Sequence, residues 1–144
     1  MARALLLLFA VVAAASAQSS TDCLSALKKA RSLIPAGDCY SKNAVDYEKF
    51  LTYPQCGLTG IYPGTYDAAF CDPFLNGYYK CAASRNGLVT PDGKFDTAVF
   101  NSKVLSGRCN GIPKYQTAYT KCHADTMKNF NFARLIVCLQ VAMA

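Results

Sequence analysis

Eight cysteines constrain this chain more than any other feature. They lie at positions 23, 39, 56, 71, 81, 109, 122 and 138, all downstream of an apolar N-terminal segment. An even number of cysteines in a short secreted chain is typical of a disulfide framework. A structural zinc site is disfavoured because there is no C-x2-C pair and only one histidine in the sequence. We therefore expect up to four disulfides and no metal site. Eight cysteines allow 105 pairings, so their number leaves the connectivity open.

The N-terminal segment, residues 1–17, has the three parts of a secretory signal peptide. Arg3 supplies the positive charge, residues 5–12 and the alanines after them form the apolar centre, and Ala15-Ser16-Ala17 is a small-residue cleavage site. The alternative is a membrane anchor, but about 12 apolar residues are fewer than the roughly 20 that span a bilayer. We expect a secreted, extracellular protein with a single domain over residues 18–144.

Apolar residues at three- and four-residue steps predict an all-α fold with no convincing sheet. The first helix begins after the capping residues 20–22, buries a face that runs from Cys23 to Leu33, and stops before Pro35. Asp72-Pro73 has the form of a helix start, and residues 88–95 read as a turn between helices. The expected helices are at about 23–33, 44–53, 73–86, 97–106, 115–124 and 126–144. About six short helices must then pack on one another as a compact bundle.

Charge and motifs argue against several functions. The formal net charge is +6 and falls by one when Arg3 is removed, and the basic residues are spread out apart from 28–31. There is no array of aromatic and basic residues of the kind that binds nucleic acid. His123 and Asp125 are two positions apart on a helix, where side chains do not face each other, so we expect an exposed histidine beside a disulfide. We predict no catalytic residues, no cofactor and no enzyme activity.

Aromatic residues are in surplus, with nine tyrosines, eight phenylalanines and no tryptophan. Ordinary core packing accounts for any one of them. Together they are consistent with an apolar cavity, because disulfides replace part of the stabilisation that tight packing would supply. The last helix is too short and too polar to insert stably in a membrane, so we expect it to form one wall. The residues expected to contact a small apolar ligand are Phe74, Tyr78, Phe95, Phe100, Leu105, Tyr119, Phe132, Ile136 and Leu139.

The C-terminal half resembles arthropod odorant- and pheromone-binding proteins. Cys81 in a helix, Gly87 after it, and the acidic-Gly turn at 92–96 leading into another helix follow the pattern of that family. Residues 133–139 are similar to the flanks of its last cysteine. The similarity covers residues 74–139, about half of the mature chain.

That family has six cysteines, and three cysteines of this chain take corresponding places. Cys81 takes the third place, Cys122 the fourth and Cys138 the sixth. Gly77 and Asn129 occupy the places of the second and fifth cysteines, which are bonded to each other in the family and are absent together here. The N-terminal half departs from the pattern and carries additional cysteines.

The resemblance implies two particular disulfides. One joins Cys122 to Cys138, and the other joins Cys81 to Cys39 or Cys56, with two further bonds among the remaining four cysteines. It also implies a helical carrier that transports a small hydrophobic molecule such as an odorant, a pheromone or a lipid. The competing hypothesis is a secreted effector with a solid core that binds a protein target through its surface, for which the loop at 55–65 is the candidate. A cavity of roughly 300 Å³ or more would favour the carrier.

Overall fold

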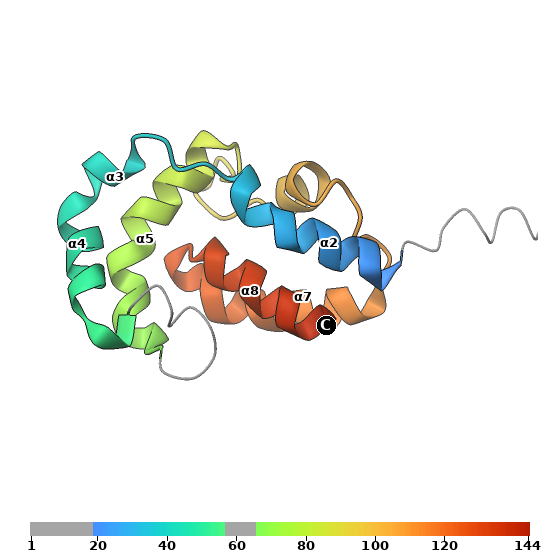
Figure 1. The fold of residues 1–144 in the computed structure, drawn as a ribbon. Coiled ribbons are helices and arrows are strands. Elements are labelled where there is room, and N and C mark those ends of the chain that lie inside the picture. Colours follow the sequence, from blue (N-terminus) through green and yellow to red (C-terminus); the bar gives the residue numbers. More distant parts are fainter. Residues whose placement is uncertain (1–18, 57–65) are drawn as a thin grey trace, which may run out of the picture.

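The chain folds as an all-α protein, which confirms the expected fold class (Figure 1). The computed structural model describes residues 19–56 and 66–144, so the signal peptide expected at 1–17 and most of the loop expected at 55–65 lie outside the described residues. No strand occurs in the described ranges. The α-helices are α2 (Ser20–Ala30), α3 (Cys39–Lys42), α4 (Ala44–Thr52), α5 (Ala68–Arg85), α6 (Thr97–Val99), α7 (Pro113–Thr126) and α8 (Phe132–Met143). Short 3-10 turns follow at Arg31–Leu33, Pro54–Cys56 and Met127–Asn129, and a π-helical turn at Phe100–Val104 extends α6.

Helix α2 buries most of the predicted face, but it begins at Ser20, so residues 20–22 lie inside the helix and are not its caps, and its end also differs. The Ser19 side chain caps it by accepting a hydrogen bond from the Asp22 backbone N–H. Cys23, Leu27 and two alanines form its buried face. Leu33 was expected on this face but is 53% exposed. The helix tightens to a 3-10 turn at Arg31, and three residues per turn instead of 3.6 rotate Leu33 off the buried side.

Helix α5 begins five residues before the predicted start. Asp67 is the capping residue, and its side chain accepts a hydrogen bond from the Phe70 N–H at 3.1 Å. Pro73 therefore lies inside the helix, where it removes one backbone hydrogen bond at a cost of about 3 kcal/mol. Asp72 is not a cap but a buried residue, 2% exposed. The prediction was wrong because Asp72-Pro73 fits a helix start equally well in sequence.

Residues 88–95 form a turn between helices, as predicted. Gly87 ends α5 with a φ of +69°, a conformation that costs glycine little. One isolated antiparallel bridge pairs Val89 with Phe95. The Asp96 carboxylate then caps α6 by accepting a hydrogen bond from the Val99 N–H at 2.9 Å.

The last two helices meet at a different residue from the one expected. Thr126 ends α7 instead of starting the final helix, and its hydroxyl donates a hydrogen bond to the Cys122 carbonyl within α7. Asn131 caps α8 by accepting a hydrogen bond from the Arg134 N–H at 3.0 Å. Helix α8 packs against α7 and α2, and Gln140 donates a hydrogen bond to the Leu27 carbonyl of α2 at 2.8 Å (Figure 1).

All eight cysteines form disulfides: Cys23–Cys109, Cys39–Cys81, Cys56–Cys71 and Cys122–Cys138. The second and fourth are pairs that the family resemblance implies. Four disulfides in a chain of this length are typical of extracellular proteins. Within 19–56 and 66–144, no helix has the length and apolar character needed to cross a membrane.

Candidate functional site

A cavity of about 160 Å³, partly open to solvent, lies where the segment after α2, the middle of α4, the middle of α5 and the first turn of α8 converge. Aromatic and aliphatic side chains make up most of its wall, together with one arginine. The lining residues are Arg31, Ile34, Ala36, Tyr47, Phe50, Leu75, Tyr78, Tyr79 and Phe132. The cavity lies between the final helix and α5, and its volume is about half of the roughly 300 Å³ that would favour a carrier.

The α4 side of the cavity is fixed by close packing against α5, with the two helices side by side (Figure 1). The Cys39–Cys81 disulfide joins the segment just before α4 to α5. Gly77 faces the Asn43 side chain so closely that a Cβ at this position would collide with it. As a result the Tyr47 ring lies 4.9 Å from a tyrosine ring of α5, centroid to centroid.

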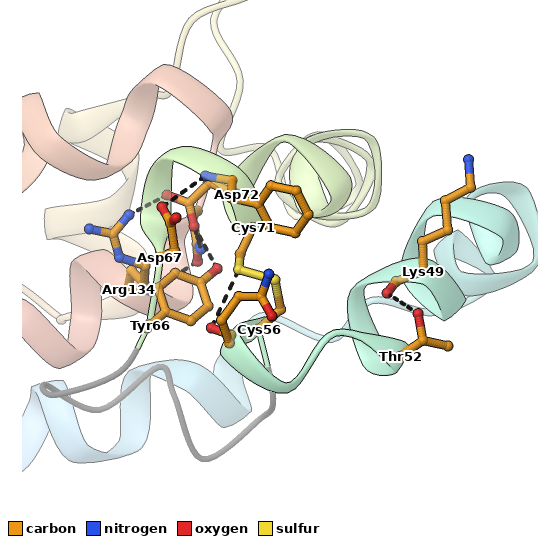
Figure 2. Close-up of a disulfide and its surroundings, with 11 residues drawn as sticks. Lys49, Thr52, Cys56, Tyr66, Asp67, Cys71, Asp72 and Arg134 are labelled. Carbon is orange, nitrogen blue, oxygen red and sulfur yellow. Dashed lines mark hydrogen bonds and ion pairs between the residues drawn. A yellow bond between two sulfur atoms is a disulfide. The ribbon is translucent and has the colours of Figure 1, made fainter.

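The α8 side is positioned by a buried polar cluster centred on Asp72. Its carboxylate accepts hydrogen bonds from the Tyr66 hydroxyl and the Asn131 amide, both at 2.7 Å, and pairs with the Arg134 guanidinium (Figure 2). Burial and this hydrogen bond raise the pKa of Tyr66, so its hydroxyl remains a donor. A buried carboxylate is costly unless its charge is paired and it accepts hydrogen bonds, as here. The cluster fixes the start of α8 and thereby sets Phe132 against the cavity.

The Cys56–Cys71 disulfide lies next to this cluster (Figure 2). Cys71 precedes Asp72 in the first turns of α5, in the segment ahead of Pro73. The disulfide and the Asp72 cluster hold this segment in helical form despite the proline. Both therefore support the cavity without touching it.

Aromatic rings form a continuous chain along the wall. Tyr78 lies between Tyr47 and Tyr79, with ring centroids 4.9 and 5.3 Å away, and Tyr79 contacts Phe132 at 4.8 Å with a near-perpendicular geometry. Such edge-to-face contacts add about 0.5–1.5 kcal/mol beyond burial. Burial raises the pKa of the Tyr79 hydroxyl, and the positive charge of Arg31 acts against that shift. Arg31 therefore lies close enough to Tyr79 for its charge to affect the pKa of that hydroxyl.

The nine residues expected to contact a ligand do not form one wall. Tyr78 and Phe132 line the cavity. Leu105, Ile136 and Leu139 are fully or almost fully buried in the core. The other four, Phe74, Phe95, Phe100 and Tyr119, belong to two separate aromatic clusters.

One of these clusters is solid and contains the histidine. Phe95 and Phe100 have centroids 5.5 Å apart, and the His123 ring lies 5.5 Å from Tyr119 and 6.4 Å from Phe95. His123 was expected to be exposed but is half-buried, and burial lowers its pKa. The Tyr119 hydroxyl donates a hydrogen bond to Thr97, and burial raises its pKa to about 12. His123 therefore has a packing role here.

The other cluster lies at the surface, where α5 begins. Tyr53 stacks on Phe74 at 5.6 Å and meets Phe70 edge-on at 4.9 Å. Tyr53 and Phe70 are both more than one-third exposed. Phe74 thus belongs to a surface aromatic group and not to the cavity.

Sequence reasoning missed most of the wall. Tyr47 and Phe50 are three positions apart, a helical spacing, and Tyr79 is adjacent to Tyr78, so the sequence did contain a signal for them. Arg31 is exposed, in line with its place in the basic run at 28–31, and it also lines the cavity. Its place at the cavity follows from the turn after α2, which no local pattern specifies.

The cavity combines apolar side chains, one positively charged side chain and tyrosine residues. In the described part of the chain, no three metal-ligating side chains cluster together. Comparison with known proteins gave no match to a family model, to a characterised sequence or to a solved structure.

Proposed function

We propose that this chain is a secreted carrier that binds one small, mainly apolar molecule in the cavity between α4, α5 and α8. The observation that supports this most directly is the cavity itself, about 160 Å³ and lined mainly by aromatic and aliphatic side chains. The Cys39–Cys81 disulfide ties the α5 wall to the segment that leads into α4, and such a cross-link replaces part of the stabilisation that tight packing would supply. A disulfide framework and the expected signal peptide favour an extracellular carrier.

The volume limits the ligand to one ring or a short chain. An engineered apolar cavity of about 150 Å³ in another protein accepts benzene. The best small ligands gain at most about 1.5 kcal/mol per non-hydrogen atom, so a six-atom ring reaches no more than roughly 9 kcal/mol, close to micromolar affinity. Long fatty molecules would require the cavity to enlarge.

A titration with small aromatic probes tests the proposal. Phenol and toluene should bind the oxidised protein with a single site and a Kd between about 1 μM and 1 mM, measured by NMR chemical-shift changes. Ala36→Leu places a larger side chain at the cavity wall and should abolish binding. Ala124→Leu is the matched control, because Ala124 is exposed on α7 and should leave binding unchanged. Failure of every small apolar probe to bind would refute the carrier.

The surface aromatic group favours a second candidate function. Tyr53, Phe70 and Phe74 form an exposed aromatic patch of the kind that is enriched at protein interfaces. A secreted effector could bind a protein target there. Ala36→Leu separates the two functions, because it blocks the cavity and leaves this patch unchanged.

A further inference from the structure

We propose that the ligand of this cavity carries a carboxylate, held by Arg31, with its apolar part in the aromatic pocket. This inference rests on the proposed function and names the chemical class of the ligand. The inference depends on the polar groups that line the cavity. They supply a positive charge and hydrogen-bond donors, and none of them is negatively charged.

Arg31 has the charge and the freedom to bind an anion. Arg85 and Arg134 both form ion pairs. No carboxylate of the described residues pairs with Arg31. The nearest candidate along the chain, Asp38, pairs instead with Arg85 and Lys42. A guanidinium presents a planar fork that matches the two oxygens of a carboxylate. Its full charge outweighs the partial negative charge of about one-half at the end of α2.

Tyrosine hydroxyls provide further donors. Those of Tyr47, Tyr78 and Tyr79 make no hydrogen bond to any residue in 19–56 or 66–144, whereas those of Tyr66 and Tyr115 are paired. Within the same ranges, no fully buried side-chain oxygen or nitrogen lacks a partner. Tyr79 is only 7% exposed and lines the cavity, so a ligand there would lie beside it.

The remaining wall excludes a cationic ligand and accepts an apolar one. No aspartate or glutamate is among the lining residues, so a bound cation would meet Arg31 without a compensating charge. Ile34, Phe50, Leu75 and Phe132 supply the apolar surface. A monocarboxylate with one ring or a short chain fits this combination of charge, donors and volume.

Benzoate and benzamide test the inference, because they have nearly the same shape and differ in charge. Both are titrated into the oxidised full-length secreted chain at pH 7.5 and low salt, with Kd measured by NMR. We expect benzoate to bind at least about tenfold more tightly than benzamide. Arg31→Gln should remove this preference while changing the benzamide Kd by less than about twofold.

Lys28→Gln is the matched control, since it removes the same charge from an exposed position of α2 outside the cavity wall. It should keep the benzoate preference. Equal binding of the two probes to the unmodified protein would overturn the carboxylate inference and leave the carrier standing. Loss of the preference in Lys28→Gln as large as in Arg31→Gln would also overturn it, since general charge would then be the cause. Absence of binding by benzoate, benzamide, phenol and toluene would overturn the carrier as well.

Discussion

Arg134 lies mostly inside the protein, and its guanidinium pairs with the still more deeply buried carboxylate of Asp72. The pair bridges α5 and α8, and the Tyr66 hydroxyl and Asn131 amide complete it. A buried ion pair of this kind need not stabilise a fold relative to well-packed apolar residues. Removing one partner is costly, because the other charge is then left buried without compensation.

Arg134→Met should therefore lower the free energy of unfolding by about 3–5 kcal/mol, measured by urea denaturation. Adding Asp72→Asn should recover part of the loss, because the amide carries no charge and can still accept hydrogen bonds from Tyr66 and Asn131. A double variant no more stable than Arg134→Met would contradict this account of the cluster.

His123 should make the free energy of unfolding decrease as the pH falls. Burial lowers its pKa below the ordinary value of 6.5, so the unfolded chain binds the proton more readily. Its contribution is complete above pH 6.5 and is lost as the pH falls through the folded-state pKa. His123 is the sole histidine of the chain, so no other imidazole contributes.

His123→Gln should flatten the fall in stability between pH 7.5 and pH 5. Urea denaturation of both proteins at several pH values measures the difference, and the carboxylates, which titrate in both, cancel. Parallel curves for the two proteins would show that the environment of His123 does not favour the neutral imidazole.

At the scale of elements, sequence patterns located most helices and misplaced several of their boundaries. The helix ends at Gly87 and Asp96 were predicted because a glycine with positive φ and an acidic cap act locally. The starts of α5 and α8 were not, because a different capping residue was available nearby in each case. Asp67 and Asn131 are the capping residues in the structure because their side chains accept hydrogen bonds from backbone N–H groups of the first turn. A sequence pattern does not show which of several possible caps will form such a bond.

Gly77 of α5 lies close to Asn43, in the segment before α4. Gly77→Ala gains about 1 kcal/mol of helix propensity. It also forces a Cβ into Asn43, whose amide donates a hydrogen bond to the Cys39 carbonyl at 2.8 Å. Overpacking costs about 1–3 kcal/mol, so we expect a net loss of stability in thermal unfolding.

The control for this prediction removes the Asn43 side chain, which the new methyl group would otherwise meet. In an Asn43→Ala background the collision is absent, and Gly77→Ala should become neutral or stabilising. The same loss in both backgrounds would show that Asn43 is not what the new methyl group meets.

At the scale of the whole molecule, the sequence predicted the helical fold and its disulfides better than it predicted which residues line the cavity. Four disulfides and an all-α bundle follow from cysteine number and periodicity. The cavity depends on how distant segments meet, and Arg31 reaches it only because the turn after α2 directs the chain toward α5. The aromatic surplus was a real signal, but it is divided among a cavity, a solid cluster and a surface patch, and residue type does not distinguish these three.

The disulfide that closes the longest loop should contribute most to stability. Cys23–Cys109 spans 86 residues and Cys122–Cys138 spans 16. In the chain-entropy model the shorter loop is worth about 3 kcal/mol. The longer one is worth about 4 kcal/mol, because the disulfide between α3 and α5 shortens its path. Replacing both cysteines of each pair by alanine should therefore cost more at 23 and 109 than at 122 and 138, in urea denaturation of the oxidised proteins. The opposite order would mean that packing around the sulfurs, and not the entropy of the unfolded chain, governs the contribution of these bonds.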